Sequence, residues 1–417
     1  MKPLNILISA YACQPNMGSE PGVGWHLAQE LAKYHRVWVL TRVSNRAAIE
    51  AELTQHPVDR LTFLYSDPPL VAKELPPAHV PHYYFWQVGA YFAAKTLLKT
   101  VDIDLVHHVT YVRYSTPSFL ALLPVPFVWG PVGGGEMAPP PFWGDFSRRG
   151  QVYEVVRSLV HRIGELDPFT QITARRSLLV KATTQDTAKR LKKIGATNVQ
   201  VSPAIGMSKQ ELELLAPVNG VQSTSLHSSF RLITVARLLH WKGIHLGLRA
   251  FAQASLPDNS EYWILGNGPE QANLQQLAHQ LGISQQVKFI GNLPRSDVLE
   301  HLRYCDALVH PSLHESGGFV CLEAMAAGRP VICLDLGGPS IQVTSETGIK
   351  VSATSPSQTI RELATAMEKL AYVPDMGQQM GAAGQRRVQQ FFSWEAKGLE
   401  LSQQYAALCQ EVTPCAS

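Results

Sequence analysis

The chain has 417 residues, 45% hydrophobic and 17% charged, with a formal net charge of +3. One hydrophobic core rarely serves a chain of this length, so we expect two domains of about 200 residues each. The composition excludes a low-complexity protein and a membrane-spanning one. The six cysteines are scattered without a C-x-x-C pair, which is typical of reduced cytosolic thiols and indicates no metal site.

The first half of the chain alternates strand and helix signals. Residues 4–10 form an apolar run, which we interpret as a buried strand and not as a signal peptide. A loop over residues 11–21 leads to Gly22 and Gly24, which we expect to open a helix. This loop lacks the third glycine of a dinucleotide fingerprint, which disfavours an NAD enzyme. Further strands are expected over residues 61–65, 104–109, 125–129, 178–182 and 199–202, with helices over 82–99 and 185–194.

Two features follow strands of this half. His107 and His108 stand at the end of the strand over residues 104–109, and only one of two adjacent strand residues faces a given side of the sheet. A glycine run followed by a proline run, residues 129–141, cannot be helical. It is either a rigid connection or a loop whose N–H groups meet ligand oxygens, and both interpretations stay open.

The window from Arg148 to Lys193 is basic, with eleven Lys or Arg residues against four Asp or Glu. Six apolar residues fall in it at helical spacing: Val152, Val155, Val156, Leu159, Val160 and Ile163. We expect an amphipathic helix on a core, and keep a helix on a membrane surface as the alternative.

The second half restarts after an irregular stretch rich in Ser, Pro and Gly. Strands are expected over residues 231–236, 262–265, 287–290, 307–310 and 330–334, and only helices after these. The βα alternation in both halves predicts two doubly wound α/β domains with parallel sheets facing one another across a cleft. We place them at residues 1–205 and 230–391, with a linker over 206–229 and a terminal helix over 392–417 that packs back on the first domain.

The stretch over residues 314–330, HESGGFVCLEAMAAGRP, combines two acids with a glycine pair and a helix start. Gly317 and Gly318 let backbone approach a ligand, and the N–H groups near Phe319 can bind phosphate or hydroxyl groups. Glu315 and Glu323 surround this helix start, where ionised carboxylates accept several hydrogen bonds from a sugar.

With VARLLHWKG, ILGNGPE, IGNLP and FSWE, this stretch resembles the nucleotide-sugar half of a family 4 retaining glycosyltransferase of the GT-B fold. The resemblance implies transfer of a sugar from a nucleotide diphosphate sugar to an acceptor hydroxyl, without a metal or other cofactor. It implies catalytic roles for His108, Arg237, Lys242 and Glu315. It implies donor binding by Gly22, Gly24, Gly266, Gly291, Asn292, Leu293, Ser316, Gly317, Gly318, Phe319 and Glu323.

Several points stay open. Retention arises either from front-face attack, which we favour, or from a double displacement, for which Glu20 and Glu136 are unremarkable candidates. A sugar-nucleotide epimerase, a phosphorylase and a non-catalytic sugar-nucleotide-binding subunit are the alternatives. We expect a glycan or lipid-linked acceptor, a cytoplasmic protein with peripheral contact to an anionic membrane, and no nucleic acid.

Overall fold

The computed structural model describes residues 2–67, 80–111, 113–216 and 229–412. Its contacts divide the chain into two compact units. Unit 1 comprises Met1–Gly135, Ser158–Gly206 and Trp394–Ser417, and unit 2 comprises Glu136–Arg157 and Met207–Ser393. These boundaries differ from the expected ones in residues 136–157, which join unit 2. Of the expected linker, residues 217–228 lie outside the described part, and a helix, α7, occupies Lys209–Leu215.

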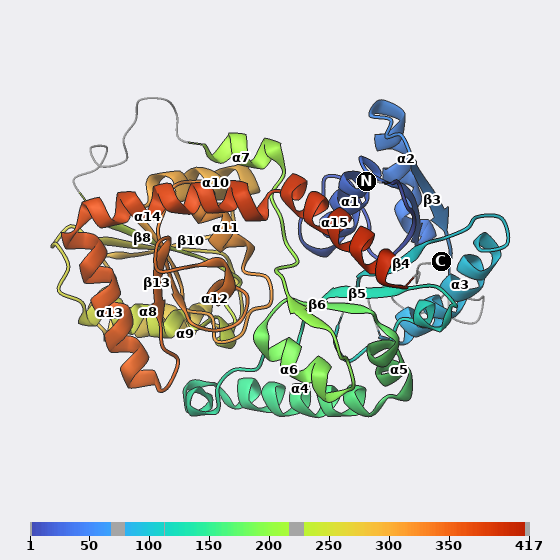
Figure 1. Cartoon of the computed structure of the whole chain (residues 1–417). Helices are drawn as coiled ribbons and strands as arrows, with labels where there is room; N and C mark the ends of the chain where they lie inside the picture. Colours follow the sequence, from blue (N-terminus) through green and yellow to red (C-terminus); the bar gives the residue numbers. More distant parts are fainter. Residues whose placement is uncertain (1, 68–79, 112, 217–228, 413–417) are drawn as a thin grey trace. The chain divides into compact units, whose positions relative to one another are not determined.

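Unit 1 contains a seven-stranded parallel sheet in the order β3-β2-β1-β4-β5-β6-β7 (Figure 1). Its strands are β1 (Asn5–Ala10), β2 (Arg36–Thr41), β3 (Leu61–Tyr65), β4 (Leu105–Thr110), β5 (Phe127–Val132), β6 (Leu179–Ala182) and β7 (Val199–Val201). Every residue of β4 is buried, as expected for a central parallel strand covered on both faces. The strand order reverses between β1 and β4, which makes their carboxyl ends a topological switch point.

The helices of unit 1 are α1 (Ser19–Ala32), α2 (Arg46–Gln55), α3 (Val80–Leu97), α5 (Pro168–Arg176), α6 (Gln185–Lys193) and α15 (Trp394–Val412). Helix α4 (Arg148–Leu166) crosses the boundary after Arg157. α15 packs on α1, and Tyr405 of α15 belongs to the hydrophobic core formed with β1. None of the helices in the described residues has the length and apolar composition that a membrane span requires.

The start of α1 corrects the prediction for Gly22 and Gly24. The helix begins at Ser19, so both glycines lie inside it and not in a loop before it. A Cβ atom on Gly22 would lie 2.2 Å from the Met17 carbonyl oxygen, and one on Gly24 would lie 2.5 Å from that of Ala12. These glycines therefore let the preceding loop fold closely against the helix.

Unit 2 contains a six-stranded parallel sheet in the order β10-β9-β8-β11-β12-β13. Its strands are β8 (Arg231–Val235), β9 (Glu261–Leu265), β10 (Val287–Gly291), β11 (Ala307–His310), β12 (Val331–Leu334) and β13 (Gly348–Val351). The prediction of helices alone after residue 334 was wrong, because β13 extends the sheet by pairing with β12. Four residues with only their ends buried give a weak sequence signal for a strand.

The α-helices of unit 2 are α7, α8 (Ile244–Gln253), α9 (Gln271–Gln280), α10 (Arg295–Tyr304), α11 (Phe319–Ala326), α12 (Pro339–Gln342), α13 (Pro356–Tyr372) and α14 (Pro374–Arg387). Short turns of other helix types are η4 (Pro140–Asp145), η5 (His240–Lys242) and η6 (Val388–Phe392). The apolar face of α8 packs into the core of the unit through Leu248 and Phe251, as its periodicity predicts.

Candidate functional site

The candidate residues of the second half gather at one edge of the unit 2 sheet. Arg237 and Lys242 follow β8, Gly266 follows β9, Gly291 ends β10, and Glu315 follows β11. The strand order runs outward in opposite directions from the β8–β11 pair, so the carboxyl ends of these two strands form a topological switch point. Ligands of open α/β sheets bind in the crevice outside such a point.

The loop after β8 supplies two cations. Arg237 is exposed, and its side chain forms no hydrogen bond or ion pair with any residue that the structure describes. Lys242 ends the η5 turn and is 17% exposed. The next residue, Gly243, has φ +63°, and a Cβ atom there would lie 2.0 Å from the Pro311 carbonyl oxygen. Only glycine fits this position, which fixes where the loop presents Lys242.

Lys242 donates a hydrogen bond to Glu315 and forms an ion pair with it. Burial acts to raise the pKa of Glu315, but the charge and hydrogen bond of Lys242, together with His310 and the Gly318 N–H, outweigh it and lower the pKa to about 2. The Glu315 carbonyl oxygen accepts a hydrogen bond of 2.8 Å from the Gly338 N–H, so the backbone that carries the carboxylate is also held. The pair is therefore a fixed, ionised acid beside a fixed cation.

The glycine pair shapes the start of α11. Gly318 is the N-cap residue with φ 65°, and a Cβ atom on it would lie 2.9 Å from Pro339. Glycine has no side chain to cap the helix, and the Cys321 N–H donates a hydrogen bond of 2.9 Å to the Gly318 carbonyl oxygen. The N–H groups of Phe319 and Val320 are therefore the ones that can meet an anion or a hydroxyl. At Gly317 a Cβ atom would meet none of the described atoms within 4 Å, so this glycine borders open space.

Glu323 lies one turn into α11 and is 8% exposed. Burial raises the pKa of Glu323 to about 7, although the charge of Arg295 counteracts this. Arg295 Nη2 lies 2.9 Å from Glu323 and 2.7 Å from Glu211, and its guanidinium lies 5.0 Å from the ring centre of Phe319. One arginine thus joins α7, α10 and α11. No local sequence pattern predicts the contacts of Glu211 and Arg295, because both residues lie far from Glu323 in the chain.

The loops after β9 and β10 lie beside this edge. Gly266 has φ +120°, and a Cβ atom there would lie 2.0 Å from the Ala236 carbonyl oxygen. Its N–H donates a hydrogen bond of 2.7 Å to the Gly291 carbonyl oxygen. These glycines bring the loops together, while Asn292 is exposed and Leu293 is half-buried. Base binding by Gly291, Asn292 and Leu293 stays a prediction.

A buried carboxylate that the sequence analysis missed connects the two principal loops. Glu154 in α4 is fully buried, and its Oε1 lies 3.2 Å from His240 Nε2 and 3.4 Å from His314 Nε2. His240 precedes Lys242 by two residues, and His314 precedes Glu315 by one. Burial acts to raise the pKa of Glu154, but the two imidazoles and the charge of Arg157 outweigh it and lower the pKa to about 2.

Aromatic rings stack beside the contacts of Glu154 with the two histidines. Trp241 stacks on Tyr153 at 5.0 Å and on His314 at 5.0 Å, with interplanar angles of 10° and 16°. These contacts and Glu154 position both loops from the first part of α4. The apolar spacing of residues 152–163 could have revealed that Glu154 lies on the opposite face of the helix from the valines.

Glu136, in the glycine-rich stretch, also reaches the site. Its carboxylate accepts a hydrogen bond from the Ser316 hydroxyl, and its carbonyl oxygen accepts one of 3.0 Å from Arg157 Nη2. Glu136 is 2% exposed. Within unit 2, the end of this stretch therefore supports the Glu315 loop, which favours the interpretation of residues 129–141 as more than a plain connection.

His108 lies in unit 1 at the switch point between β1 and β4. It is fully buried, with Nε2 at 3.0 Å from the Tyr83 hydroxyl and Nδ1 at 2.9 Å from the Ser9 hydroxyl. His107 points to the other face and contacts Tyr405. Because both ring nitrogens of His108 are engaged, a catalytic role would require one of these bonds to open, and that role stays a prediction. Donor contacts of Gly22 and Gly24 likewise stay predictions.

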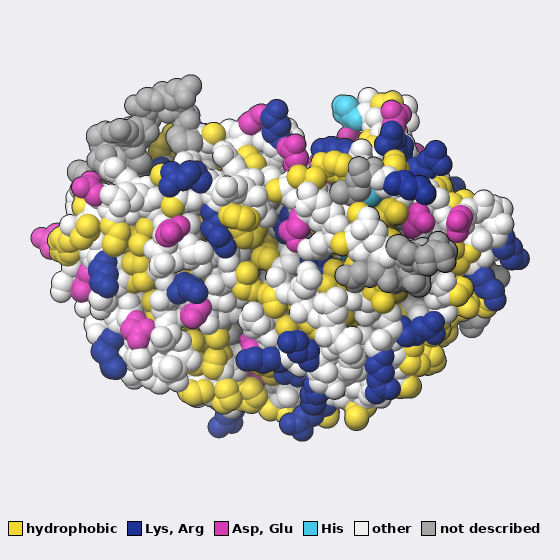
Figure 2. Space-filling model, viewed as in Figure 1, with side chains coloured by type: hydrophobic (Ala, Val, Ile, Leu, Met, Phe, Trp, Pro, Cys, Tyr) yellow, Lys and Arg dark blue, Asp and Glu magenta, His cyan; other side chains and the backbone are white. Residues whose placement is uncertain are grey.

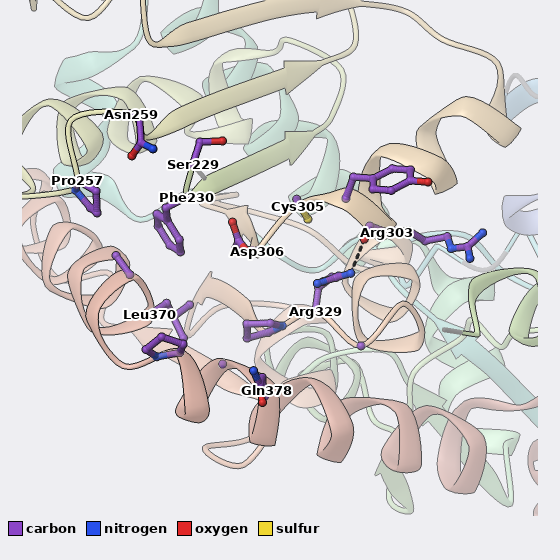
Figure 3. Close-up of a pocket in the computed structure, with 16 residues that line it drawn as sticks. Ser229, Phe230, Pro257, Asn259, Arg303, Cys305, Asp306, Arg329, Leu370 and Gln378 are labelled. Carbon is purple, nitrogen blue, oxygen red and sulfur yellow. Dashed lines mark hydrogen bonds between the residues drawn. The ribbon is translucent and has the colours of Figure 1, made fainter. Parts of the chain in front are cut away.

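A separate cavity in unit 2 lies away from these residues. It has a volume of about 310 Å³ and is lined by Phe230, Asp306 and Arg329, which precede β8, β11 and β12 (Figure 3). Arg329 points across it and donates a hydrogen bond to the Arg303 carbonyl oxygen. None of the candidate donor residues lines this cavity, which opens at the amino ends of the strands.

Residues 222–387 match the family model described as "Glycosyl transferases group 1". A D-inositol 3-phosphate glycosyltransferase of Corynebacterium diphtheriae is 32% identical to the chain over 190 residues, which are 43% of this chain and 43% of that enzyme. The matched part is thus less than half of the length of this relative.

Two solved structures resemble almost the whole chain. A sucrose-phosphate synthase from Thermosynechococcus elongatus has a TM-score of 0.64 at 18% identity, over 97% of this chain and 99% of that one. HepE from Anabaena in complex with UDP has a TM-score of 0.62 at 19% identity, over 97% of this chain and 100% of that one. Together with the two Rossmann-like parallel sheets, these likenesses confirm the predicted GT-B fold class.

Proposed function

We propose that this chain, whose residues 222–387 belong to the glycosyl transferases group 1, is a glycosyltransferase that moves a sugar from a nucleotide diphosphate sugar to an acceptor hydroxyl. The observation that carries the proposal is the Lys242–Glu315 ion pair at the switch point of unit 2, beside the exposed Arg237. The likeness to a protein solved in complex with UDP supports a donor of this class.

Each candidate group of unit 2 has a role in this proposal. Arg237 and Lys242 bind the diphosphate, Glu323 accepts hydrogen bonds from the ribose hydroxyls, and Glu315 with Ser316, Gly317, Gly318 and Phe319 holds the sugar. Gly266 lets the adjacent loop approach, and Gly291, Asn292 and Leu293 lie against the base. The chemistry fits, since ionised acids accept hydroxyl donors and cations neutralise phosphate charge.

The reaction that we propose retains the anomeric configuration without a metal ion. The bond between the anomeric carbon and the diphosphate oxygen breaks, and the acceptor oxygen forms its bond on the same face of the sugar. The acceptor proton passes to the leaving phosphate oxygen. Arg237 and Lys242 stabilise the negative charge that develops on the diphosphate, as preorganised cations do in phosphate chemistry.

A double displacement would instead need a carboxylate at the anomeric carbon. In unit 2 the Glu136 carboxylate already accepts a hydrogen bond from Ser316, and in unit 1 Glu20 accepts one from the Tyr111 N–H. These hydrogen bonds indicate that both acids hold neighbouring backbone or side-chain groups in place, which favours front-face attack. We further propose a glycan or lipid-linked glycan as the acceptor, which a cytoplasmic enzyme would reach at the inner face of a membrane.

Thermal unfolding in the presence of UDP, GDP, ADP and NAD tests the donor site. A ligand at about a hundred times its dissociation constant adds about 2.7 kcal/mol to the stability of the folded protein. We expect one nucleoside diphosphate to raise the melting temperature, and Lys242→Ala or Glu323→Gln to abolish or reduce that rise. Lys369→Ala is the matched control, because Lys369 is an exposed lysine of the same unit in α13.

No rise with any diphosphate would contradict the proposed donor site. A rise together with product formed in the absence of any acceptor would identify a sugar-nucleotide epimerase. A rise without turnover for any glycan or lipid-linked acceptor would favour a binding subunit. Transfer of labelled sugar to an added acceptor is the result that supports the proposal.

A further inference from the structure

The apolar face of α4 points outward. The expectation that this face packs on a core was wrong. Seven aliphatic side chains along the helix are between 53% and 76% exposed: Val152, Val155, Val156, Leu159, Val160, Ile163 and Leu166. They recur at helical spacing, and Phe169 at the start of α5 is also 44% exposed. A contiguous exposed row of this kind marks an interaction surface.

The inward face of α4 is polar, which explains the orientation of the helix. In unit 2, Glu154 and Arg157 make the contacts with His240 and Glu136. In unit 1, Glu165 forms ion pairs of 2.7 Å with both Arg190 and Lys193, and His161 packs edge-on against Tyr114. These specific contacts hold the polar face against the protein, so the apolar face is left in solvent.

The surface around the exposed row is basic. Arg148, Arg149, Arg162, Arg175, Arg176 and Lys192 are exposed, while the acids Glu154 and Glu165 of the same helix are buried. Figure 2 shows hydrophobic and basic side chains intermixed at the place where Figure 1 draws α4. A second copy of the chain would bring like charges together across a symmetric contact.

A hollow in unit 1 adjoins the end of this row. It has a volume of about 530 Å³, and its lining includes Arg162, Arg175, Lys193 and the exposed Leu166. Neither Arg162 nor Arg175 forms an ion pair with any residue in the described part of the chain. Arg175 Nη2 donates a hydrogen bond of 3.1 Å to Gln171 Oε1, which leaves the positive charge of its guanidinium unbalanced by an acid. Two guanidinium groups without an acidic partner beside an apolar row match a lipid with a phosphate head and hydrocarbon chains.

We propose that the outward face of α4, with the hollow at Arg162 and Arg175, binds the surface of an anionic lipid bilayer. The aliphatic side chains enter the boundary between headgroups and acyl chains, and the arginines contact lipid phosphates. Such a helix lies in the plane of the interface and does not span the membrane. The proposal stands on this surface alone and does not depend on sugar transfer.

Co-sedimentation of the full chain with vesicles tests the proposal. Vesicles of phosphatidylcholine alone are compared with vesicles that also contain phosphatidylglycerol, at low and high salt. We expect binding to the anionic vesicles only, weakened by salt. Ile163→Asp should lower the partition coefficient more than about tenfold, since it removes an aliphatic side chain that the bilayer would bury and adds a negative charge.

The double variant Arg162→Gln with Arg175→Gln should lower the partition by roughly fivefold for each arginine. Tyr372→Asp is the matched control, because Tyr372 is 60% exposed against 61% for Ile163 and lies on α13 of unit 2. Unchanged circular dichroism and melting show that each variant folds. Absence of binding at low salt, or binding that the α4 variants do not reduce, would overturn the proposal. So would a dimer in sedimentation velocity that Ile163→Asp dissociates while vesicles bind neither protein.

Discussion

The buried carboxylate of Glu154 offers a direct test of how the site is held together. Glu154→Gln keeps the shape of the side chain and removes its charge. The folded protein lowers the pKa of Glu154 from 4.5 to about 2. At about 1.4 kcal/mol per unit of pKa, the folded environment favours the ionised form by about 3 kcal/mol relative to the unfolded chain.

We expect the variant to lose about 3 kcal/mol of stability at neutral pH, because His240, His314 and Arg157 lose the anion that they surround. For a unit of this size, each kcal/mol shifts the melting temperature by about 2–4 °C, so the expected decrease is about 6–12 °C. Thermal unfolding followed by circular dichroism measures it. Glu300→Gln is the matched control, since Glu300 is an exposed acid of α10.

The pH dependence provides a second measurement with a fixed sign. The pKa of Glu154 is lower in the folded chain, so the unfolded chain binds more protons between about pH 4.5 and pH 2. The stability that Glu154 contributes is therefore complete above about pH 4.5 and disappears as the pH falls towards 2. The difference in stability between wild type and variant should follow this course. A variant that melts like the wild type at neutral pH would refute the reasoning.

Three further predictions concern the loops of the site. Lys242→Ala should lower turnover by about 10²–10³-fold in a sugar-transfer assay, because the departing diphosphate loses the cation that stabilises its negative charge. The far-ultraviolet circular dichroism of the variant should match that of the wild type. Gly243→Ala should lower the free energy of unfolding by about 1–3 kcal/mol in urea titrations, because φ is +63° and a Cβ atom would overlap a carbonyl oxygen. Gly317 borders open space, so Gly317→Ala should leave the free energy of unfolding nearly unchanged. The pKa of Glu323 is about 7, and the charge of Arg295 lowers it. Only the ionised acid accepts two ribose hydroxyls, so binding of a nucleoside diphosphate is lost as the pH falls. Arg295→Gln should therefore raise the pH at which calorimetric titrations show this loss.

Each of these has a clear contrary result. Near-normal turnover of Lys242→Ala would remove this lysine from the mechanism. Equal stability of the two alanine variants would show that the turn before α8 tolerates a side chain. An unchanged pH profile in Arg295→Gln would mean that Glu323 does not titrate in ligand binding, since the ionisation of the ligand is common to both proteins.

The sequence alone determined most strands of both sheets, though not β13, and the residues at the carboxyl ends of the strands it located. Short apolar runs followed by glycine locate a buried strand and its turn without knowledge of the rest of the fold. Glu315 and Glu323 were found for this reason, because both lie close to such a turn, whereas Arg237 and Lys242 were found through the motif resemblance. The roles of these residues in sugar transfer rest on motif resemblance and remain to be tested.

Only the tertiary structure decided which distant residues meet at the site. Glu136, Glu154, Glu211 and Arg295 are brought to the edge by chain segments far from the loops that they support, and no local pattern encodes such contacts. Periodicity also identified α4 as amphipathic without deciding which face is buried. That depends on the partners available, and here polar partners hold the polar face inward and leave the aliphatic face exposed.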